Sequence, residues 1–344
     1  MKVALIRPSY YLPDGRVHKL RRPYLISATL PHLAALTPDD VEVELVEENV
    51  QDIDFDTDAD LIGITAMINT APRAYDIADE FRRRGKKVVL GGVHFSSIPE
   101  EAIRHADAVV IGEAEDVWPQ VLRDFQRGEL KPFYRREGWA DLSRLPTPRY
   151  DLLPYKRFPL TFYPVQTSRG CPHHCDFCAV TSFFGHTYRL RPVEHVLRDV
   201  RATGSRYIFF VDDNFAVNRK RTLELCEALK PLRITWVTQV EITAGVDPEV
   251  CQAMAESGCR AVVIGIESIN PKSLESISKR HNLSLLKDYP RIIRNFQENG
   301  IAVVASVIFG MNGDTLQSLR QTVKFLVDNQ VAGAMFYTLL PYPG

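Results

Sequence analysis

Short apolar strands alternate with amphipathic helices along almost the whole chain of 344 residues, and this alternation constrains the fold more than any other feature. A strand followed by a helix and a second strand normally builds a parallel sheet with helices on its faces. A stretch with five prolines, residues 142–164, separates two such series and is typical of a linker. We therefore predict an α/β protein with two domains, residues 1–141 and 165–344.

The first series predicts a flavodoxin-like, doubly wound parallel sheet of five strands. The strands are expected at residues 3–7, 41–47, 61–65, 87–90 and 108–111, with helices at 27–36, 70–84, 99–105 and 116–126. In such a fold the ligand crevice lies beyond the carboxyl ends of the strands. The candidate ligand contacts at these ends are Tyr10, Thr65, Gly91, Gly92, His94 and Glu113.

The second series predicts a partial (β/α)6 TIM-type barrel. Its strands are expected at residues 165–168, 207–212, 235–241, 261–267, 302–309 and 334–340, and its helices at 193–203, 219–229, 247–257, 283–299 and 316–328. Active sites of such barrels are built at the carboxyl ends of the strands. Functional side chains are therefore expected just after each strand.

A cysteine motif with C-x₃-C-x₂-C spacing, formed by Cys171, Cys175 and Cys178, follows the first strand of the second series. A [4Fe–4S] cluster normally takes four cysteine thiolates, so three would leave one iron open to a small molecule. The alternative is zinc, with His173 or His174 as a fourth ligand. Structural zinc sites usually show pairs of C-x₂-C rather than one triplet, and we favour the cluster.

The remaining cysteines and the acidic residues at strand ends are weighed in the same way. Cys226, Cys251 and Cys259 lack ligand spacing and are expected to be core thiols. Asp212 and Asp213 suit a cationic amino group, although a strand end or a helix cap would also explain them. Glu267 ends an apolar run, where an unpaired acid is costly, so either a ligand or an internal cation is expected beside it. Gln239 and Glu241, which end the third strand, are weaker candidates, and Arg169 either balances charge or anchors the loop.

These motifs resemble those of the radical SAM superfamily. Its members cleave S-adenosylmethionine reductively at a [4Fe–4S] cluster to start radical chemistry on an unactivated carbon. The resemblance makes the three cysteines of the motif cluster ligands, with the preferred aromatic residue, Phe177, before the last of them. It also implies contacts to S-adenosylmethionine from residues at the strand ends: Asp212, Asp213, Gln239, Glu267, Ser268, Ile308, Gly310 and Leu340.

The first domain resembles the cobalamin-binding domain that precedes the barrel in one branch of this superfamily, which includes class B methyltransferases and an anaerobic ring cyclase. The D-x-H-x-x-G motif of many cobalamin proteins is absent, and residues 93–97 read VHFSS. The resemblance implies cobalamin-dependent methyl transfer. The alternatives are a radical cyclase or oxidoreductase without methyl transfer and, more remotely, a non-catalytic iron–sulfur electron carrier.

Charge and hydropathy bound the partners. The formal net charge of -1 gives no argument for nucleic acid. No apolar stretch approaches the roughly 20 residues of a spanning helix, and residues 1–8 are not a signal peptide, so a cytoplasmic protein is expected. The resemblance implies a small-molecule substrate, such as a lipid or tetrapyrrole, and reduced flavodoxin or ferredoxin as electron donor. It also implies that the further C-terminal region of relatives is lacking.

Overall fold

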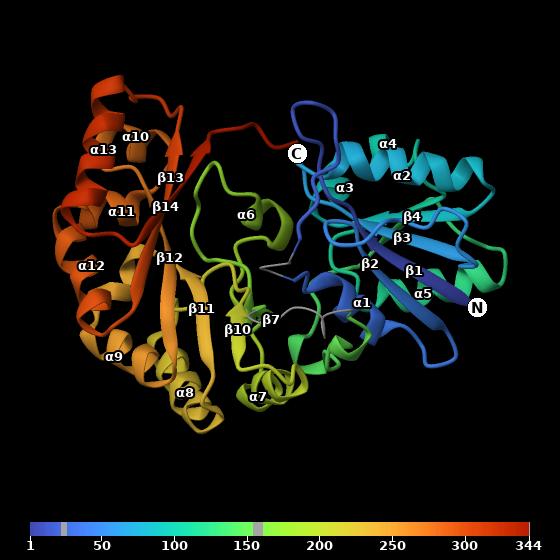
Figure 1. Cartoon of the computed structure of the whole chain (residues 1–344), viewed down its shortest axis with the longest axis horizontal. Coiled ribbons are helices and arrows are strands. Elements are labelled where there is room, and N and C mark those ends of the chain that lie inside the picture. Colours follow the sequence, from blue (N-terminus) through green and yellow to red (C-terminus); the bar gives the residue numbers. More distant parts are fainter. Residues whose placement is uncertain (22–25, 154–160, 344) are drawn as a thin grey trace. The chain divides into compact units, whose positions relative to one another are not determined.

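The computed structural model describes residues 1–21, 26–153 and 161–343. The chain forms two compact units, Met1–Thr161 and Phe162–Tyr342 (Figure 1). Residues 154–160 of the expected linker lie outside the described residues, whereas residues 142–153 belong to the first unit. There the backbone N–H of Arg149 donates to the carbonyl of Pro31 at 2.9 Å.

The first unit contains a six-stranded parallel sheet in the order β2-β1-β3-β4-β5-β6. The first five strands follow the flavodoxin-like order, which confirms the predicted fold. They are β1 (Lys2–Arg7), β2 (Glu42–Glu47), β3 (Leu61–Thr65), β4 (Lys87–Gly91) and β5 (Ala108–Ile111). The prediction of five strands was one short. The extra edge strand β6 (Phe133–Arg135) has only three residues, too few for a periodic signal.

Helices cover both faces of this sheet (Figure 1). One face carries α1 (Thr29–Leu36) and α5 (Val117–Gln126), and the other carries α2 (Ala71–Arg83), α3 (Val93–Ser97) and α4 (Pro99–Ala102). The inner strands β1, β3, β4 and β5 are mostly buried, as parallel strands between helices must be. Helix α3, directly after β4, was not predicted because its five residues are mostly polar or small.

The second unit is built on six parallel strands in the order β14-β13-β12-β11-β10-β7. This open, sequential order confirms the partial barrel. The strands are β7 (Tyr163–Val165), β10 (Tyr207–Phe210), β11 (Thr235–Val240), β12 (Cys259–Glu267), β13 (Ala302–Phe309) and β14 (Gly333–Thr338). The expected first strand, 165–168, is split. Its end forms β8 (Ser168–Arg169), which pairs antiparallel with β9 (Arg189–Leu190).

The connecting helices follow the prediction except between β12 and β13. The expected single helix 283–299 is broken into α11 (Arg280–Leu285), a 3₁₀ turn η6 (Leu286–Asp288) and α12 (Tyr289–Glu298), because Pro290 cannot continue a helix across that point. The remaining helices are α6 (Ala179–Phe184), α7 (Val193–Ala202), α8 (Arg219–Leu229), α9 (Pro248–Glu256), α10 (Pro271–Ser276) and α13 (Leu316–Asp328). The short helices α6 and α10 were not predicted.

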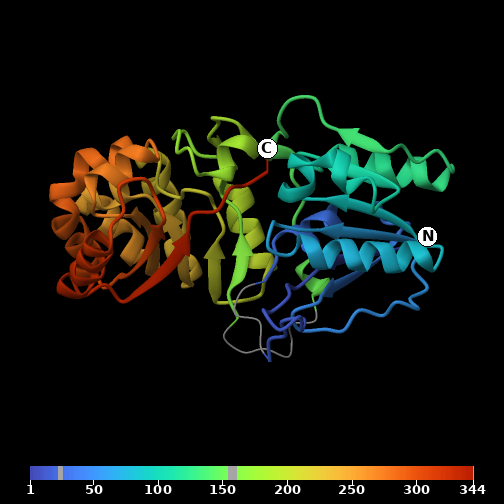
Figure 2. The ribbon, with the colours of Figure 1, turned by 90° about the horizontal axis from the view of Figure 1, so that it is seen from above.

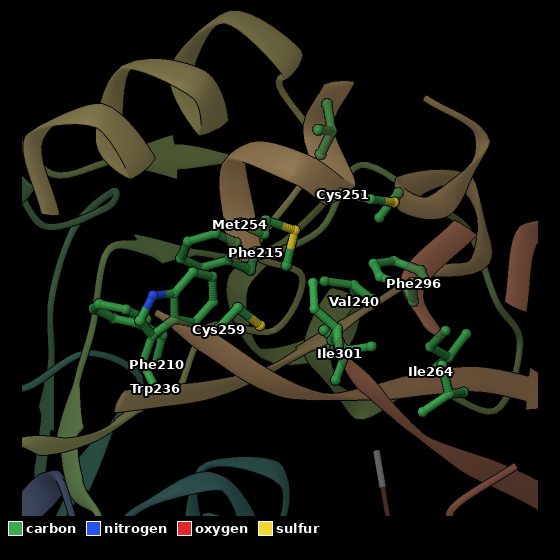
Figure 3. Packing of buried hydrophobic residues seen from close by; sticks show 14 of the residues in the cluster. Phe210, Phe215, Trp236, Val240, Cys251, Met254, Cys259, Ile264, Phe296 and Ile301 are labelled. Carbon is green, nitrogen blue, oxygen red and sulfur yellow. The ribbon is translucent and has the colours of Figure 1, made fainter. Parts of the chain in front are cut away.

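The core of the second unit lies between its sheet and helices α8, α9 and α12, which lie on the outer side of the sheet in both ribbon views (Figures 1 and 2). In this core Trp236 packs against Phe210 and Phe215, at ring separations of 5.2 and 5.1 Å (Figure 3). The thiols of Cys226, Cys251 and Cys259 are fully buried in this core, which confirms their expected role. No helix among the described residues is long and apolar enough to cross a bilayer.

Candidate active site

The three cysteines of the motif lie on one loop, residues 170–188, closed at its base by the pairing of β8 with β9. Gly170 opens the loop with φ +84°, and a Cβ there would lie 2.2 Å from the carbonyl oxygen of Thr187. Only glycine allows both this conformation and this close approach. The two ends of the loop are therefore held together before its first cysteine.

Two neighbouring aspartates after β10 fix the entry to this loop. The carboxylate of Asp212 is fully buried and accepts hydrogen bonds from the backbone N–H groups of Thr167 and Ser168 and from the Thr167 hydroxyl. Asp213 accepts from the N–H of Gly170 at 2.8 Å. Burial raises the pKa of Asp212 to about 6, and these hydrogen bonds oppose the shift.

The structure thus gives Asp212 and Asp213 a supporting role. Both were expected to contact a ligand amino group, yet both carboxylates bind backbone of the loop entry. Asp212 has no exposed surface. A direct contact to a ligand therefore stays a prediction for Asp213 and has no support in the geometry of Asp212.

The thiols of Cys171, Cys175 and Cys178 are half-buried. Burial raises the pKa of all three, for Cys175 to about 11, and the nearby Lys279 ammonium partly opposes this at Cys175 and Cys178. The Asn214 amide donates to the Cys171 sulfur at 3.9 Å. A metal that binds these thiols must therefore displace their protons, as metals bound by cysteine do.

The arrangement of the thiols fits an iron–sulfur cube better than a single zinc ion. Ligand atoms around one tetrahedral zinc lie roughly 3.5 Å apart, given bonds of about 2.0–2.3 Å. Among the described residues, the one group of three or more His, Cys, Asp or Glu ligand atoms within 4.8 Å of one another is His173, Glu241 and His281. The sulfur atoms of the three motif cysteines therefore do not all lie within 4.8 Å of one another, and the other three cysteines are in the core. A cube held here keeps one iron free of protein thiolate.

A buried ion pair lies next to the cysteine loop. Glu267, the last residue of β12, pairs with Lys279, and their side chains are only 5% and 7% exposed. Of the two options for Glu267, the structure shows the internal cation, and a contact to a ligand stays a prediction. Glu267 has φ +58°, in the left-handed region, and the register of β12 against β13 shifts beside it. The Lys279 ammonium also lies 5.6 Å from the ring centre of Phe177.

Apolar residues from the ends of two strands, β13 and β14, and from the end of α10 lie around Phe177. Phe177 packs against the buried cluster of Ile277, Ile308 and Met311, against which Leu339 also packs. Of the expected contacts nearby, Ser268 caps its own turn by accepting from the N–H of Asn270, and Gly310 donates its N–H to Asp314. Leu340 is 60% exposed. Phe177 and Ile308 are thus brought together with the cysteine loop, whereas Leu340 is not part of this cluster.

The end of β11 adds a second polar group beside the loop. Gln239 donates to the backbone carbonyl of Asp212 at 2.8 Å. Glu241 lies against two rings, with its Oε2 2.5 Å from His173 Nε2 and 3.2 Å from His281 Nε2. Burial alone would raise the pKa of Glu241, but His173 and the Thr243 hydroxyl outweigh it and hold that pKa below its usual value. Burial lowers the pKa of His281 to about 4.

Sequence reasoning missed Lys279, His281 and Asn214. Lys279 and His281 follow β12 in the stretch SISKRHN, which lacks a spacing signal. Only the fold brings them to the cysteine loop. Asn214 directly follows Asp212 and Asp213, and this position was the signal that could have found it.

The carboxyl edge of the first unit's sheet forms a separate candidate site. Gly92, after β4, has φ +105°, and a Cβ there would lie 2.9 Å from the Ala66 carbonyl and 2.8 Å from Thr65 Oγ1. Gly91 ends β4 beside Thr65. A Cβ at Gly112 would have no neighbouring atom within 4 Å. The backbone at Gly92 therefore lies too close to residues 65 and 66 for a side chain, whereas the backbone at Gly112 is open to a ligand.

Three further expected contacts lie at or near this edge. His94 packs against Tyr75 and Phe95, its Nδ1 is buried without a hydrogen-bond partner, and burial lowers its pKa. Glu113 is buried and accepts from the N–H of Ala140 at 2.7 Å, a structural contact. Tyr10 stacks on His18 at 4.6 Å. The open backbone and the unpartnered His94 nitrogen are compatible with a bound cobalamin.

Both units match known protein families. Residues 165–326 match the radical SAM superfamily, and residues 28–122 match the B12 binding domain. These matches confirm the predicted cofactor set, in which the second unit uses a [4Fe–4S] cluster and S-adenosylmethionine and the first uses cobalamin. They also confirm that the chain is an enzyme of the predicted kind rather than a simple electron carrier.

Individual relatives agree. The chain is 34% identical to bacteriochlorophyllide d C-8(2)-methyltransferase of Chlorobaculum tepidum, over 93% of this chain and 74% of the relative. It is 31% identical to bacteriochlorophyllide d C-12(1)-methyltransferase of the same organism, over 83% of this chain and 64% of the relative. The radical SAM methyltransferase TsrM of Kitasatospora setae, solved with cobalamin and a [4Fe–4S] cluster, shares the fold at a TM-score of 0.75 and 18% identity, over 98% of this chain and 74% of that one.

Proposed function

The chain belongs to the radical SAM superfamily, in the branch with an N-terminal B12-binding domain, and from this we propose that it methylates an unactivated carbon of a small-molecule substrate. The observation that carries the proposal is the cysteine loop. Its three half-buried thiols are spread too widely for one zinc ion, and it lies beside Lys279 and the apolar residues around Phe177. The cubane would keep one iron for the sulfonium cofactor.

When bound, the cluster supplies the electron that splits the S–C5′ bond of S-adenosylmethionine, and cobalamin supplies the transferred methyl group. The residues of the chain hold and shield these groups. Asp212 and Asp213 fix the loop entry. Lys279, held by its ion pair with Glu267, places its ammonium near Cys175, and Phe177 packs on the apolar cluster that contains Ile308. At the edge of the first sheet, Gly112 leaves backbone open for the corrin.

The proposal extends to the substrate, the electron donor, the location and the domain boundaries. A tetrapyrrole substrate is proposed because the two methyltransferase relatives are named for bacteriochlorophyllide d, a tetrapyrrole. A lipid is the alternative that the family resemblance implies. Reduced flavodoxin or ferredoxin is proposed as the electron donor. A cytoplasmic location fits six cysteines that are all free thiols. We keep residues 1–141, 142–164 and 165–344 as the proposed domain, linker and barrel boundaries.

The experiment is anaerobic reconstitution of the full chain with iron, sulfide and cobalamin, followed by S-adenosylmethionine and a strong reductant. We expect 5′-deoxyadenosine to form and corrin absorbance to co-purify with the protein. The Cys178→Ala variant should form no 5′-deoxyadenosine, whereas the matched core variant Cys226→Ala should form it. A fully loaded wild-type protein that leaves S-adenosylmethionine intact would refute the proposed function.

Product mass separates methyl transfer from the second candidate, radical ring closure or oxidation. With a bacteriochlorophyllide as trial substrate, methyl transfer adds one methyl group, and deuterated methyl groups of S-adenosylmethionine appear in the product. Ring closure or oxidation gives a product without the label. The deuterium label therefore distinguishes the two reactions, both of which begin with cleavage of S-adenosylmethionine.

A further inference from the structure

A compact group of two imidazoles and one carboxylate lies beside the cysteine loop and has no role in the proposed function. His173 comes from the loop itself, Glu241 directly follows β11, and His281 lies in α11. Their ligand atoms lie within 4.8 Å of one another, the one such group among the described residues. Three elements far apart in sequence thus converge on one point.

The contacts in this group are short but are not satisfied hydrogen bonds. Both rings approach the same oxygen, Glu241 Oε2, at 2.5 and 3.2 Å. Even so, His173 Nε2 and Glu241 Oε2 are buried atoms without a hydrogen-bond partner. Their separation is short enough for a hydrogen bond, but the angle between the groups is not suitable for one. Such buried atoms carry a cost unless a further group binds them.

The surroundings orient the group as they do around metal ligands. The Thr243 hydroxyl donates to the other carboxylate oxygen, Oε1, at 2.7 Å, which leaves Oε2 to face the rings. The rings of His173 and His281 lie 4.1 Å apart, tilted by 30°. The three side chains are 29%, 11% and 17% exposed in chain order, so solvent reaches the group only partly. An outer hydrogen bond that fixes a ligating carboxylate is a regular feature of metal sites.

We propose that His173, Glu241 and His281 bind one divalent transition-metal ion, of the Zn²⁺ or Fe²⁺ class, at a site separate from the cluster thiolates. Two imidazoles and a carboxylate are typical ligands of these ions, whereas Mg²⁺ and Ca²⁺ prefer oxygen ligands alone. Metal–ligand bonds of about 2.0–2.2 Å require the 2.5 Å contact to open by several tenths of an ångström. Three protein ligands leave at least one position for water or a small molecule.

The position of His173 gives the ion a structural consequence. This residue lies between Cys171 and Cys175, so an ion bound to it ties the cysteine loop to β11 and α11. The bound ion should therefore protect the loop in the cluster-free protein. This inference does not depend on methyl transfer or on cleavage of S-adenosylmethionine.

The test uses the full chain with Cys171, Cys175 and Cys178 all replaced by alanine, so that thiolates cannot bind the added metal. Titration with Co²⁺ should reach one equivalent per chain, with visible bands of nitrogen and oxygen ligation and without the intense near-ultraviolet band of thiolate ligation. The His281→Ala change should weaken binding more than about 10-fold, and Thr243→Ala by about 10-fold, the lower limit for outer hydrogen-bond partners.

The matched control is His174→Ala. His174 adjoins His173 but stacks on His186 at 3.6 Å, so its loss should leave Co²⁺ affinity unchanged. A second arm uses the wild-type protein with its cluster loaded, dialysed against Zn²⁺, where elemental analysis should give one zinc per chain that His281→Ala abolishes. This arm decides the question if the cysteine-free chain fails to fold. Absence of stoichiometric binding, or binding that His281→Ala leaves unchanged, overturns the proposal and leaves the group as a loop clamp.

Discussion

Asp213 holds the first cysteine from one residue away: its carboxylate accepts a hydrogen bond from the backbone N–H of Gly170 at 2.8 Å. Burial raises the pKa of Asp213, and the Gly170 N–H and the charge of Arg169 oppose that shift. Both opposing groups favour the ionised carboxylate, the form that accepts most strongly from the Gly170 N–H. Loss of this bond should therefore reduce how well the loop retains iron.

Asp213→Ala should lower the iron bound per chain after anaerobic reconstitution. The change leaves the N–H of Gly170 without its acceptor, at a cost of about 1–3 kcal/mol, and frees the loop entry. Iron and sulfide analysis measures the effect. Asp213→Asn keeps an acceptor oxygen and should retain more iron than the alanine variant. Equal iron in wild type and Asp213→Ala would show that the loop does not need this bond.

Gly170→Ala should be more damaging than alanine at another positive-φ glycine. At Gly170 a Cβ meets the Thr187 carbonyl oxygen at 2.2 Å, whereas at Gly204, with φ +63°, it meets nothing within 4 Å. Gly204→Ala should therefore lower the free energy of unfolding by about 1 kcal/mol, because only the left-handed backbone conformation is strained. Gly170→Ala has the same backbone strain, and its Cβ must in addition displace the loop at Thr187. Denaturant unfolding and iron content compare the two, and similar losses in both would contradict the close approach.

The sequence predicted most of the fold because long parallel strands carry a strong apolar signal. β3, β5 and β13 begin and end at the expected residues. The failures are short elements, such as β6 and α3, whose few residues show no period. The split of the first barrel strand was also unpredictable locally, because it depends on Asp212, which is distant in sequence and accepts from Thr167 and Ser168.

The candidate site was predictable only where spacing carries chemistry. The spacing of three cysteines within eight residues is enough to predict that they bind one group together. Lys279 and His281 lie about 100 residues further along the chain, so no sequence pattern links them to the cysteines. Glu267 shows the limit of reasoning about burial. Its place at the end of an apolar strand required a partner, but only the fold identifies that partner as Lys279.

Lys279→Met should destabilise the protein strongly. The change leaves the carboxylate of Glu267 buried without its cation, and breaking one side of a buried pair costs about 3–5 kcal/mol. The double variant with Glu267→Leu removes both charges and should recover much of the loss. Equilibrium unfolding in denaturant of the two single variants and the double variant measures this coupling. A loss below about 1 kcal/mol in Lys279→Met would mean that solvent reaches the pair.

His94 should make a contribution to the free energy of unfolding that is lost at low pH. Burial lowers its pKa below the usual 6.5, with Glu101 opposing. Below pH 6.5 the unfolded ring takes up a proton before the folded ring does, so the unfolded state binds more protons and the free energy of unfolding falls as the pH falls. His94→Gln should flatten this part of the pH profile. The NMR titration of the ring checks the premise, and a midpoint at or above 6.5 would contradict it.

Cys259→Ala should leave the bound iron unchanged although it weakens the fold. Its thiol is fully buried in the core near Trp236 (Figure 3), so the smaller side chain leaves a void that costs roughly 1 kcal/mol. Cys175→Ala should do the reverse, because a half-buried loop thiol adds little to packing but supplies a cluster ligand. Iron analysis and denaturant unfolding of both variants give the two readouts. Iron lost in Cys259→Ala at unchanged folding, or retained in full in Cys175→Ala, would mean that the cluster is held by a different set of thiols.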